Sequence, residues 1–234
     1  MEKYIEELLG KLTLEEKIGM IHGAALFETK SIERLGIPAL KMSDGTMGVR
    51  AEHEPDQWIA AGNNDDFASY LPCTSAVAST WNRELAKKAG QVLGEEARGR
   101  GKDVILGPGM NIKRSPLCGR NFEYMSEDPE VVAEIATAMV RGIQENDVAA
   151  CGKHFAANSQ ETDRNSVNTL VDERTLNEIY FPGFRAAVEE GEMLTIMGAY
   201  NRLNGEHCCT SHKLLDKVLR EEWGFDGIVV TDWG

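Results

Sequence analysis

The sequence has 234 residues, of which 42% are hydrophobic and 27% are charged, a composition typical of globular proteins rather than disordered or fibrous ones. Its formal net charge of −13 argues against partners that are polyanions, namely nucleic acids and acidic membrane surfaces. No apolar stretch approaches the roughly 18 residues that cross a bilayer, and the first residues lack the basic start of a secretory leader, so we expect a cytoplasmic protein.

The first predicted elements are a short helix, a strand and a long loop. Thr13 followed by Glu16 forms a capping box, which indicates the start of a helix. Residues 39–42 are predicted to form a strand that runs into Asp44, an acid followed by a glycine that permits an unusual turn. Residues 51–70 are polar, and we expect them to form a long loop over the mouth of the fold.

The rest of the chain alternates helices with strands. Asp128 followed by Pro129 is a helix N-cap with proline at the first helical position, and Gly101 is a typical helix stop. Hydrophobic spacing predicts helices over residues 81–100, 128–145, 172–190 and 211–224 and strands over residues 103–106, 148–151, 193–197 and 228–230, with residues 71–74 as a possible further strand.

This alternation predicts an α/β fold with a parallel sheet. Strand–helix units that repeat in this way build an open parallel sheet or a (β/α)8 barrel. We predict one TIM-barrel-like domain over residues 1–234 that is incomplete, because about six strands are present and a barrel needs eight in about 250 residues. The last strand has no helix to cover it, so we expect the chain to be the N-terminal portion of a longer protein.

Residues able to do chemistry follow the predicted strands. In parallel sheets the carboxyl ends of the strands face the ligand. The residues found at or near these ends are Asp44, Arg120, Lys153, His154, Arg164, Tyr200 and Asp232, the last followed by Trp233. In an acidic chain, cations at this place favour a neutral polyol as ligand, because they can donate charge-assisted hydrogen bonds to hydroxyl groups. They would also hold an aspartate ionised at neutral pH.

Structural roles are open alternatives for most of these residues. Asp44 could cap a turn, and Asp232 could cap a strand with its neighbouring tryptophan packed in the core. Arg120 and Arg164 could form surface salt bridges, and Tyr200 could simply pack. A lysine at the end of a buried strand is different, because its ammonium group needs a partner, so Lys153 favours a functional role.

Metal and phosphate chemistry is not indicated. His207, Cys208, Cys209 and His212 lie close in sequence, but adjacent cysteines cannot easily share one tetrahedral zinc and no second half-site exists. The five cysteines are an odd number without CxxC spacing, so we expect reduced thiols. The glycines at 107 and 109 do not form a phosphate-binding loop, and no GxSxG elbow is present. No cofactor is implied.

Four motifs in order resemble glycoside hydrolase family 3, in its β-glucosidase branch. In chain order, the motifs are GRNFE at 119–123 with SEDP at 126–129, KHF at 153–155, MGAYN at 197–201 with NG at 204–205, and EWGFDGIVVTDW at 222–233. The resemblance implies that Asp232 is the catalytic nucleophile. It also implies that the pocket for the terminal sugar is lined by Asp44, Arg120, Lys153, His154, Arg164, Met197, Tyr200 and Trp233.

The resemblance further implies a retaining, exo-acting β-glucosidase that acts on β-glucosides and oligosaccharides. Its acid/base, a glutamate, would belong to a second α/β domain that these 234 residues do not contain, so we expect the isolated chain to be poorly active or inactive. Thr46 stands where the family usually has proline, a change that should be tolerated. The N-acetylhexosaminidase branch is disfavoured, because residues 156–164 contain no histidine. A β-xylosidase or arabinofuranosidase, and a non-catalytic sugar-binding fragment, are the alternatives.

Overall fold

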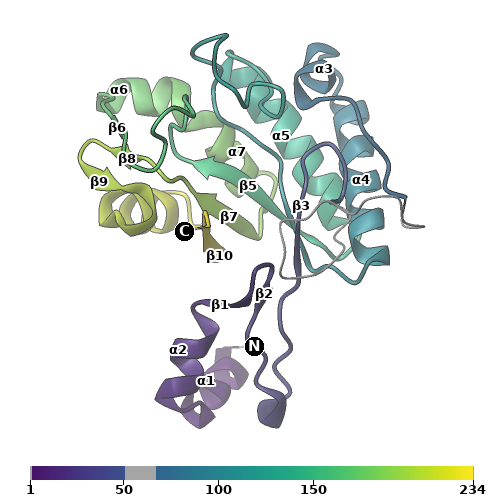
Figure 1. Ribbon diagram of the computed structural model, residues 1–234, viewed down its shortest axis with the longest axis vertical. Helices are drawn as coiled ribbons and strands as arrows, with labels where there is room; N and C mark the ends of the chain where they lie inside the picture. Colours follow the sequence, from purple (N-terminus) through teal and green to yellow (C-terminus); the bar gives the residue numbers. More distant parts are fainter. Residues whose placement is uncertain (1, 51–66, 234) are drawn as a thin grey trace.

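The fold is built on a five-stranded parallel sheet. The computed structural model describes residues 2–50 and 67–233. The strands are β3 (Met42–Asp44), β4 (Val104–Leu106), β5 (Ala149–Phe155), β7 (Thr195–Gly198) and β10 (Ile228–Thr231), in the order β10-β7-β5-β4-β3. Neighbours in the sheet follow one another along the chain, so every connection is a crossover in the same direction. The sheet curls into an incomplete (β/α) barrel, as predicted (Figure 1).

Strand periodicity decides which side chains face the inside of the curl. Val104 and Leu106 belong to an inner apolar cluster with Cys151 and Met197, whereas Ile105 between them packs into the outer core. Side chains two positions apart lie on the same face of a strand. The polar residue two positions after Cys151 is Lys153, which therefore shares the inner face at the carboxyl end of β5.

Helices cover the outer face of the sheet. The long ones are α4 (Arg83–Gly99) and α5 (Pro129–Gln144), and α7 (Pro182–Glu189) packs beside α5 (Figure 1). Asn82 and Asp128 cap the first two, since each side chain accepts hydrogen bonds from backbone N–H groups of the first turn. Proline is well suited to the first position of α5, because the backbone N–H group that it lacks would have no partner within the helix there.

The remaining elements are short. Before the sheet lie α1 (Glu2–Lys11), α2 (Leu14–Met20), β1 (Gly23–Ala25), β2 (Glu28–Thr29) and the 3-10 turn η1 (Glu33–Leu35). Between the strands lie α3 (Thr74–Ser79), β6 (Asn168–Thr169), α6 (Glu173–Thr175), η2 (Leu176–Tyr180), β8 (Arg202–Leu203), β9 (Glu206–His207), η3 (Cys208–Thr210) and the π-helix η4 (Lys213–Glu222). None of the described helices is long and apolar enough to cross a membrane.

Three expectations from the sequence need correction or fall outside the described residues. The possible strand over residues 71–74 is wrong, because Thr74 opens α3 and the proline at 72 has no N–H group to donate to a ladder. Within residues 2–50 and 67–233 the parallel sheet therefore has five strands and not six. The single helix predicted over residues 172–190 is divided into α6, the π-helical turn η2 and α7, with Pro182 at the division. Of the predicted loop 51–70, residues 51–66 lie outside the described part of the chain.

Glycines allow α4 and α5 to approach closely. A Cβ atom on Gly142 would lie 2.1 Å from the carbonyl oxygen of Lys87, and one on Gly90 would lie 2.3 Å from that of Met139. Both distances are far below van der Waals contact with backbone atoms that cannot rotate away. The two helices therefore cross with their backbones in contact, and the outer layer depends on this crossing.

We predict that Gly142→Ala lowers the free energy of unfolding by about 1–3 kcal/mol, because the added methyl group forces the helices apart. Gly99→Ala is the matched control: it lies in α4 with nothing within 4 Å of the added Cβ atom, so it should be neutral or stabilise by about 0.5 kcal/mol. Urea unfolding followed by circular dichroism measures both. Equal effects of the two substitutions would contradict the role given to the crossing.

Candidate active site

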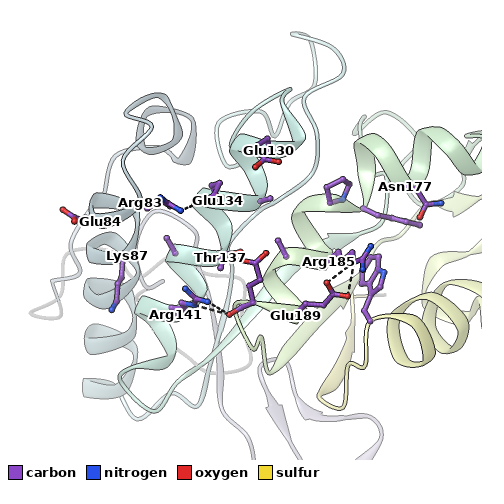
Figure 2. A pocket seen from close by; sticks show the side chains of 17 residues that line it. Arg83, Glu84, Lys87, Glu130, Glu134, Thr137, Arg141, Asn177, Arg185 and Glu189 are labelled. Atoms are coloured by element: carbon purple, nitrogen blue, oxygen red, sulfur yellow. Dashed lines mark hydrogen bonds and ion pairs between the residues drawn. The ribbon is translucent and has the colours of Figure 1, made fainter.

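Two cavities stand out in different parts of the fold. The larger one, of about 620 Å³, lies on the outer helical face between α4, α5 and α7 (Figure 2). Two of its arginines form ion pairs on the groove surface: Arg83 contacts Glu134 at 2.8 Å, and Arg185 contacts Glu189 at 3.0 Å. The groove lies away from the carboxyl ends of the strands, where ligands of barrel proteins bind, so its larger volume alone does not make it a reaction site.

The second cavity, of about 350 Å³, lies at the carboxyl ends of the strands. Its lining contains all nine residues singled out in the sequence: Asp44, Arg120, Lys153, His154, Arg164, Met197, Tyr200, Asp232 and Trp233. Phe27 and Leu106 complete the lining, and neither was singled out. Leu106 could have been found, since it is the inward residue at the end of β4, but no pattern marks Phe27. The structure thus gathers the candidates in one place, where ligands of barrel proteins bind.

Each cation of the cavity has its own carboxylate. Lys153 Nζ lies 2.9 Å from Asp44 Oδ1, and Arg164 Nη1 donates to Glu161 Oε2 at 2.9 Å. Arg120 Nε donates to Glu123, whose other carboxylate oxygen lies 3.8 Å from Lys153 Nζ. These pairs hold the donor groups in place and offset the cost of burying them.

Asp232 is a buried carboxylate without such a pair. Its Oδ2 atom has no hydrogen-bond partner among the described residues, and His154 Nε2 lies 3.7 Å from that atom. Tyr200 is a further ionisable neighbour of this carboxyl group. Burial raises the pKa of Asp232 to about 6, against the opposing attraction of Arg120, Lys153 and Arg164. Burial outweighs the three cations, but with a pKa of about 6 the carboxyl group is still mostly ionised at pH 7, as expected from the sequence.

Asp44 shows the opposite shift. Burial would raise its pKa, but the attraction and hydrogen bond of Lys153 outweigh burial and hold the pKa below its ordinary value. Gly45 N also donates to Asp44 Oδ1 at 2.9 Å. Two carboxylates of one cavity are thus in different states: Asp44 is a firmly ionised acceptor, and Asp232 is a charged group that burial disfavours.

His154 lies between these groups and is neutral. Burial, with the nearby cations Arg120, Lys153 and Arg164, lowers its pKa well below the ordinary value. The side chain of Asn111 accepts a hydrogen bond from His154 N at 2.7 Å and donates one to His154 O at 2.8 Å, which fixes the backbone.

An aromatic wall closes the cavity beside Asp232. Trp233 Nε1 donates to the carbonyl oxygen of Leu26 at 3.0 Å, and its ring packs on Phe27 with centroids 5.4 Å apart. The Tyr200 hydroxyl donates to the carbonyl oxygen of Trp233, and the Arg164 guanidinium lies over the Tyr200 ring. Burial, then the charge of Asp232, raises the pKa of Tyr200 to about 12. The hydrogen bond to Leu26 and the packing on Phe27 hold the indole of Trp233 in one orientation at the cavity edge.

Comparison with known proteins assigns the chain to a family. Residues 17–234 match the family described as the glycosyl hydrolase family 3 N terminal domain. The chain belongs to glycoside hydrolase family 3. The resemblance seen in the four motifs is confirmed, and so is the barrel-like fold.

Relatives within family 3 carry two activities in their names. Thermostable beta-glucosidase B of Acetivibrio thermocellus is 50% identical over 230 residues, which are 98% of this chain and 30% of that protein. An exo-alpha-(1->6)-L-arabinopyranosidase of Bifidobacterium longum is 44% identical over 223 residues, which are 95% of this chain and 30% of that protein. The chain spans about a third of the length of these relatives.

Solved structures of family 3 share the fold. Beta-glucosidase 3B from Thermotoga neapolitana in complex with glucose superposes with a TM-score of 0.91 at 45% identity, over 98% of this chain and 34% of that one. Beta-glucosidase from Kluyveromyces marxianus in complex with glucose gives 0.90 at 40% identity, over 98% of this chain and 27% of that one.

We predict that Asp232→Asn raises the free energy of unfolding at pH 8 by about 1–3 kcal/mol, because folding buries a charge that has no ion-pair partner. The native pKa of about 6 lies above the ordinary value of 3.8, so the cost of this charge is absent below pH 3.8, grows between pH 3.8 and 6 and is full above pH 6. Urea unfolding of both proteins at pH 4 and pH 8 measures the difference. A gain that is larger at pH 4 would contradict the assigned pKa.

Proposed function

We propose that this chain is the nucleophile-bearing barrel domain of a retaining, exo-acting β-glucosidase that removes terminal non-reducing β-D-glucosyl residues. The observation that carries the proposal is the buried, unpaired carboxylate of Asp232 in a cavity with three anchored cations. The family assignment and the names of the relatives support glycoside hydrolysis as the reaction. A volume of 350 Å³ is near the lower end for small-ligand pockets, about 300–1,000 Å³, and suits one terminal sugar ring.

The proposed reaction has two displacements at the anomeric carbon. A carboxylate oxygen of Asp232 forms a bond to C1 while the bond from C1 to the aglycone oxygen breaks, and a carboxylic acid gives that oxygen its proton. Water then attacks C1, its proton returns to the same acid, and Asp232 leaves as a carboxylate. Two inversions retain the configuration of the sugar.

The proton donor must be a second acid about 5–5.5 Å from the nucleophile. Among the described residues, Asp44 is the other carboxyl group that lines the cavity, and its lowered pKa makes it a poor proton donor at neutral pH. Following the family resemblance, we propose that the acid/base is a glutamate from a second α/β domain outside residues 1–234. This agrees with the length of the relatives, of which the chain spans about a third.

The firmly bound polar groups suit recognition of sugar hydroxyls. Ionised Asp44 accepts hydrogen bonds, Lys153 and Arg120 donate them, and the Trp233 ring offers an apolar face for the aglycone side or the ring edge. The relative with arabinopyranosidase activity makes α-L-arabinopyranosides a specific rival substrate. β-Xylosides are a second rival, because they differ from β-glucosides by the loss of the C6 hydroxymethyl group.

We predict that a 2-fluoroglucoside with a good leaving group labels Asp232 in the complete gene product, as peptide mass spectrometry would detect. Asp232→Gly should lower kcat by about 1,000-fold or more. Azide should restore turnover of an activated aryl β-glucoside and yield the α-glucosyl azide, because it attacks C1 from the side that the carboxylate leaves free. Labelling of any other residue would overturn the role of Asp232. Sugar binding without labelling or turnover would favour a non-catalytic protein.

We predict that Asp44→Asn lowers kcat/KM for an aryl β-D-glucoside by about 10-fold or more, because a charged acceptor of sugar hydroxyls becomes neutral. The loss should be smaller for the matching aryl β-D-xyloside, which lacks one hydroxyl at the far end of the ring. The same assays compare the unmodified enzyme on both sugars and on an α-L-arabinopyranoside. A higher kcat/KM of the unmodified enzyme for either rival sugar would contradict glucose as the natural substrate. If Asp44→Asn lowered kcat/KM equally for the glucoside and the xyloside, Asp44 would not recognise the hydroxyl that xylosides lack.

A further inference from the structure

A buried chain of side chains leads from the loop after β5 to the ring of His154. Asn158 Nδ2 lies 3.3 Å from the Tyr124 hydroxyl, and that hydroxyl lies 3.0 Å from His154 Nδ1. Asn158, Tyr124 and His154 are each no more than 2% exposed. At the far side of the ring, His154 Nε2 faces the unpaired Oδ2 atom of Asp232 at 3.7 Å.

The direction of these hydrogen bonds is set by the orientation of the Asn158 side-chain amide. Asn158 Nδ2 also lies 3.1 Å from Glu161 Oε1, an oxygen that accepts only, so the amide nitrogen and not its oxygen occupies this position. Its second hydrogen is then donated to the Tyr124 oxygen. The tyrosine stays protonated, because burial raises its pKa, and its own hydrogen is directed to His154 Nδ1.

We propose that Asn158 and Tyr124 are positioning residues that fix the Nε2–H tautomer of His154, so that the imidazole presents a donor to Asp232 and to the sugar beside it. A neutral imidazole carries one proton, and the nitrogen that accepts from Tyr124 cannot hold it. The opposite tautomer would place a lone pair against the carboxylate. The expected effect of the tautomer on turnover rests on the proposed function. The tautomer itself can be observed without any assay of turnover.

Reversal of the first hydrogen bond provides the test. Asn158→Asp replaces the donor by an acceptor, so the Tyr124 hydroxyl turns toward residue 158 and His154 Nδ1 must become the donor. Asn158→Leu is the matched control that removes the donor without reversing it. In the complete gene product, kcat/KM for an aryl β-glucoside should fall about 10-fold or more further with the aspartate than with the leucine.

A second background separates the tautomer from the added charge next to Glu161. In Tyr124→Phe there is no hydroxyl to reverse, so the difference between Asn158→Asp and Asn158→Leu should shrink to about 2-fold or less. An undiminished difference would mean that the new charge acts directly, and no difference in either background would mean that Asn158 only packs. Both results would overturn the proposal.

The tautomer is read directly by nuclear magnetic resonance with ¹⁵N-labelled histidine. We expect the proton of His154 on Nε2 in the unmodified protein and on Nδ1 in Asn158→Asp, with the His154→Gln spectrum as the assignment control. A proton on Nδ1 in the unmodified protein would overturn the inference whatever the enzyme assays show. Absence of glucoside turnover with the expected spectrum would instead count against the proposed function.

Discussion

The site depends on how charge is distributed in the cavity at the carboxyl ends of the strands. Three cations each lie beside a carboxylate, Lys153 with Asp44, Arg120 with Glu123 and Arg164 with Glu161. Asp232 has a general attraction to all three but no close partner, and burial therefore dominates its pKa. Burial disfavours the charged form of this carboxylate, and this suits the nucleophilic role that we propose for it, because the group loses its charge when it bonds to carbon.

The parallel sheet makes this distribution possible. Consecutive strands bring their carboxyl ends to one rim, and residues two positions beyond the inner apolar cluster become the lining of the cavity. Val230 belongs to that cluster, and Asp232 follows it by two positions, as Lys153 follows Cys151. The packing of the inner apolar cluster therefore also fixes the positions of the polar residues that follow it at the carboxyl ends of the strands.

The sequence predicts the strands and their end residues well, because a short β-branched run followed by a polar residue is a local signal. The possible strand over residues 71–74 lacked such a run, and there the chain instead enters α3 at Thr74. The carboxylates behind the cavity were missed for another reason. Glu123 and Glu161 lie in loops, and only the folded chain shows that they pair with the arginines. The burial that raises the pKa of Asp232 also depends on packing that no local pattern in the sequence shows.

Trp233 joins two parts of the molecule that lie far apart in sequence. Its indole N–H group holds the Leu26 carbonyl across 207 positions, while its ring forms part of the cavity wall with Phe27. The same side chain is therefore both a tether for the segment before the sheet and a surface that a sugar would touch. A smaller side chain at this position, chosen to admit a bulkier substrate, would also remove the hydrogen bond to Leu26. Substrate selectivity and the attachment of the N-terminal segment therefore cannot be changed independently at Trp233.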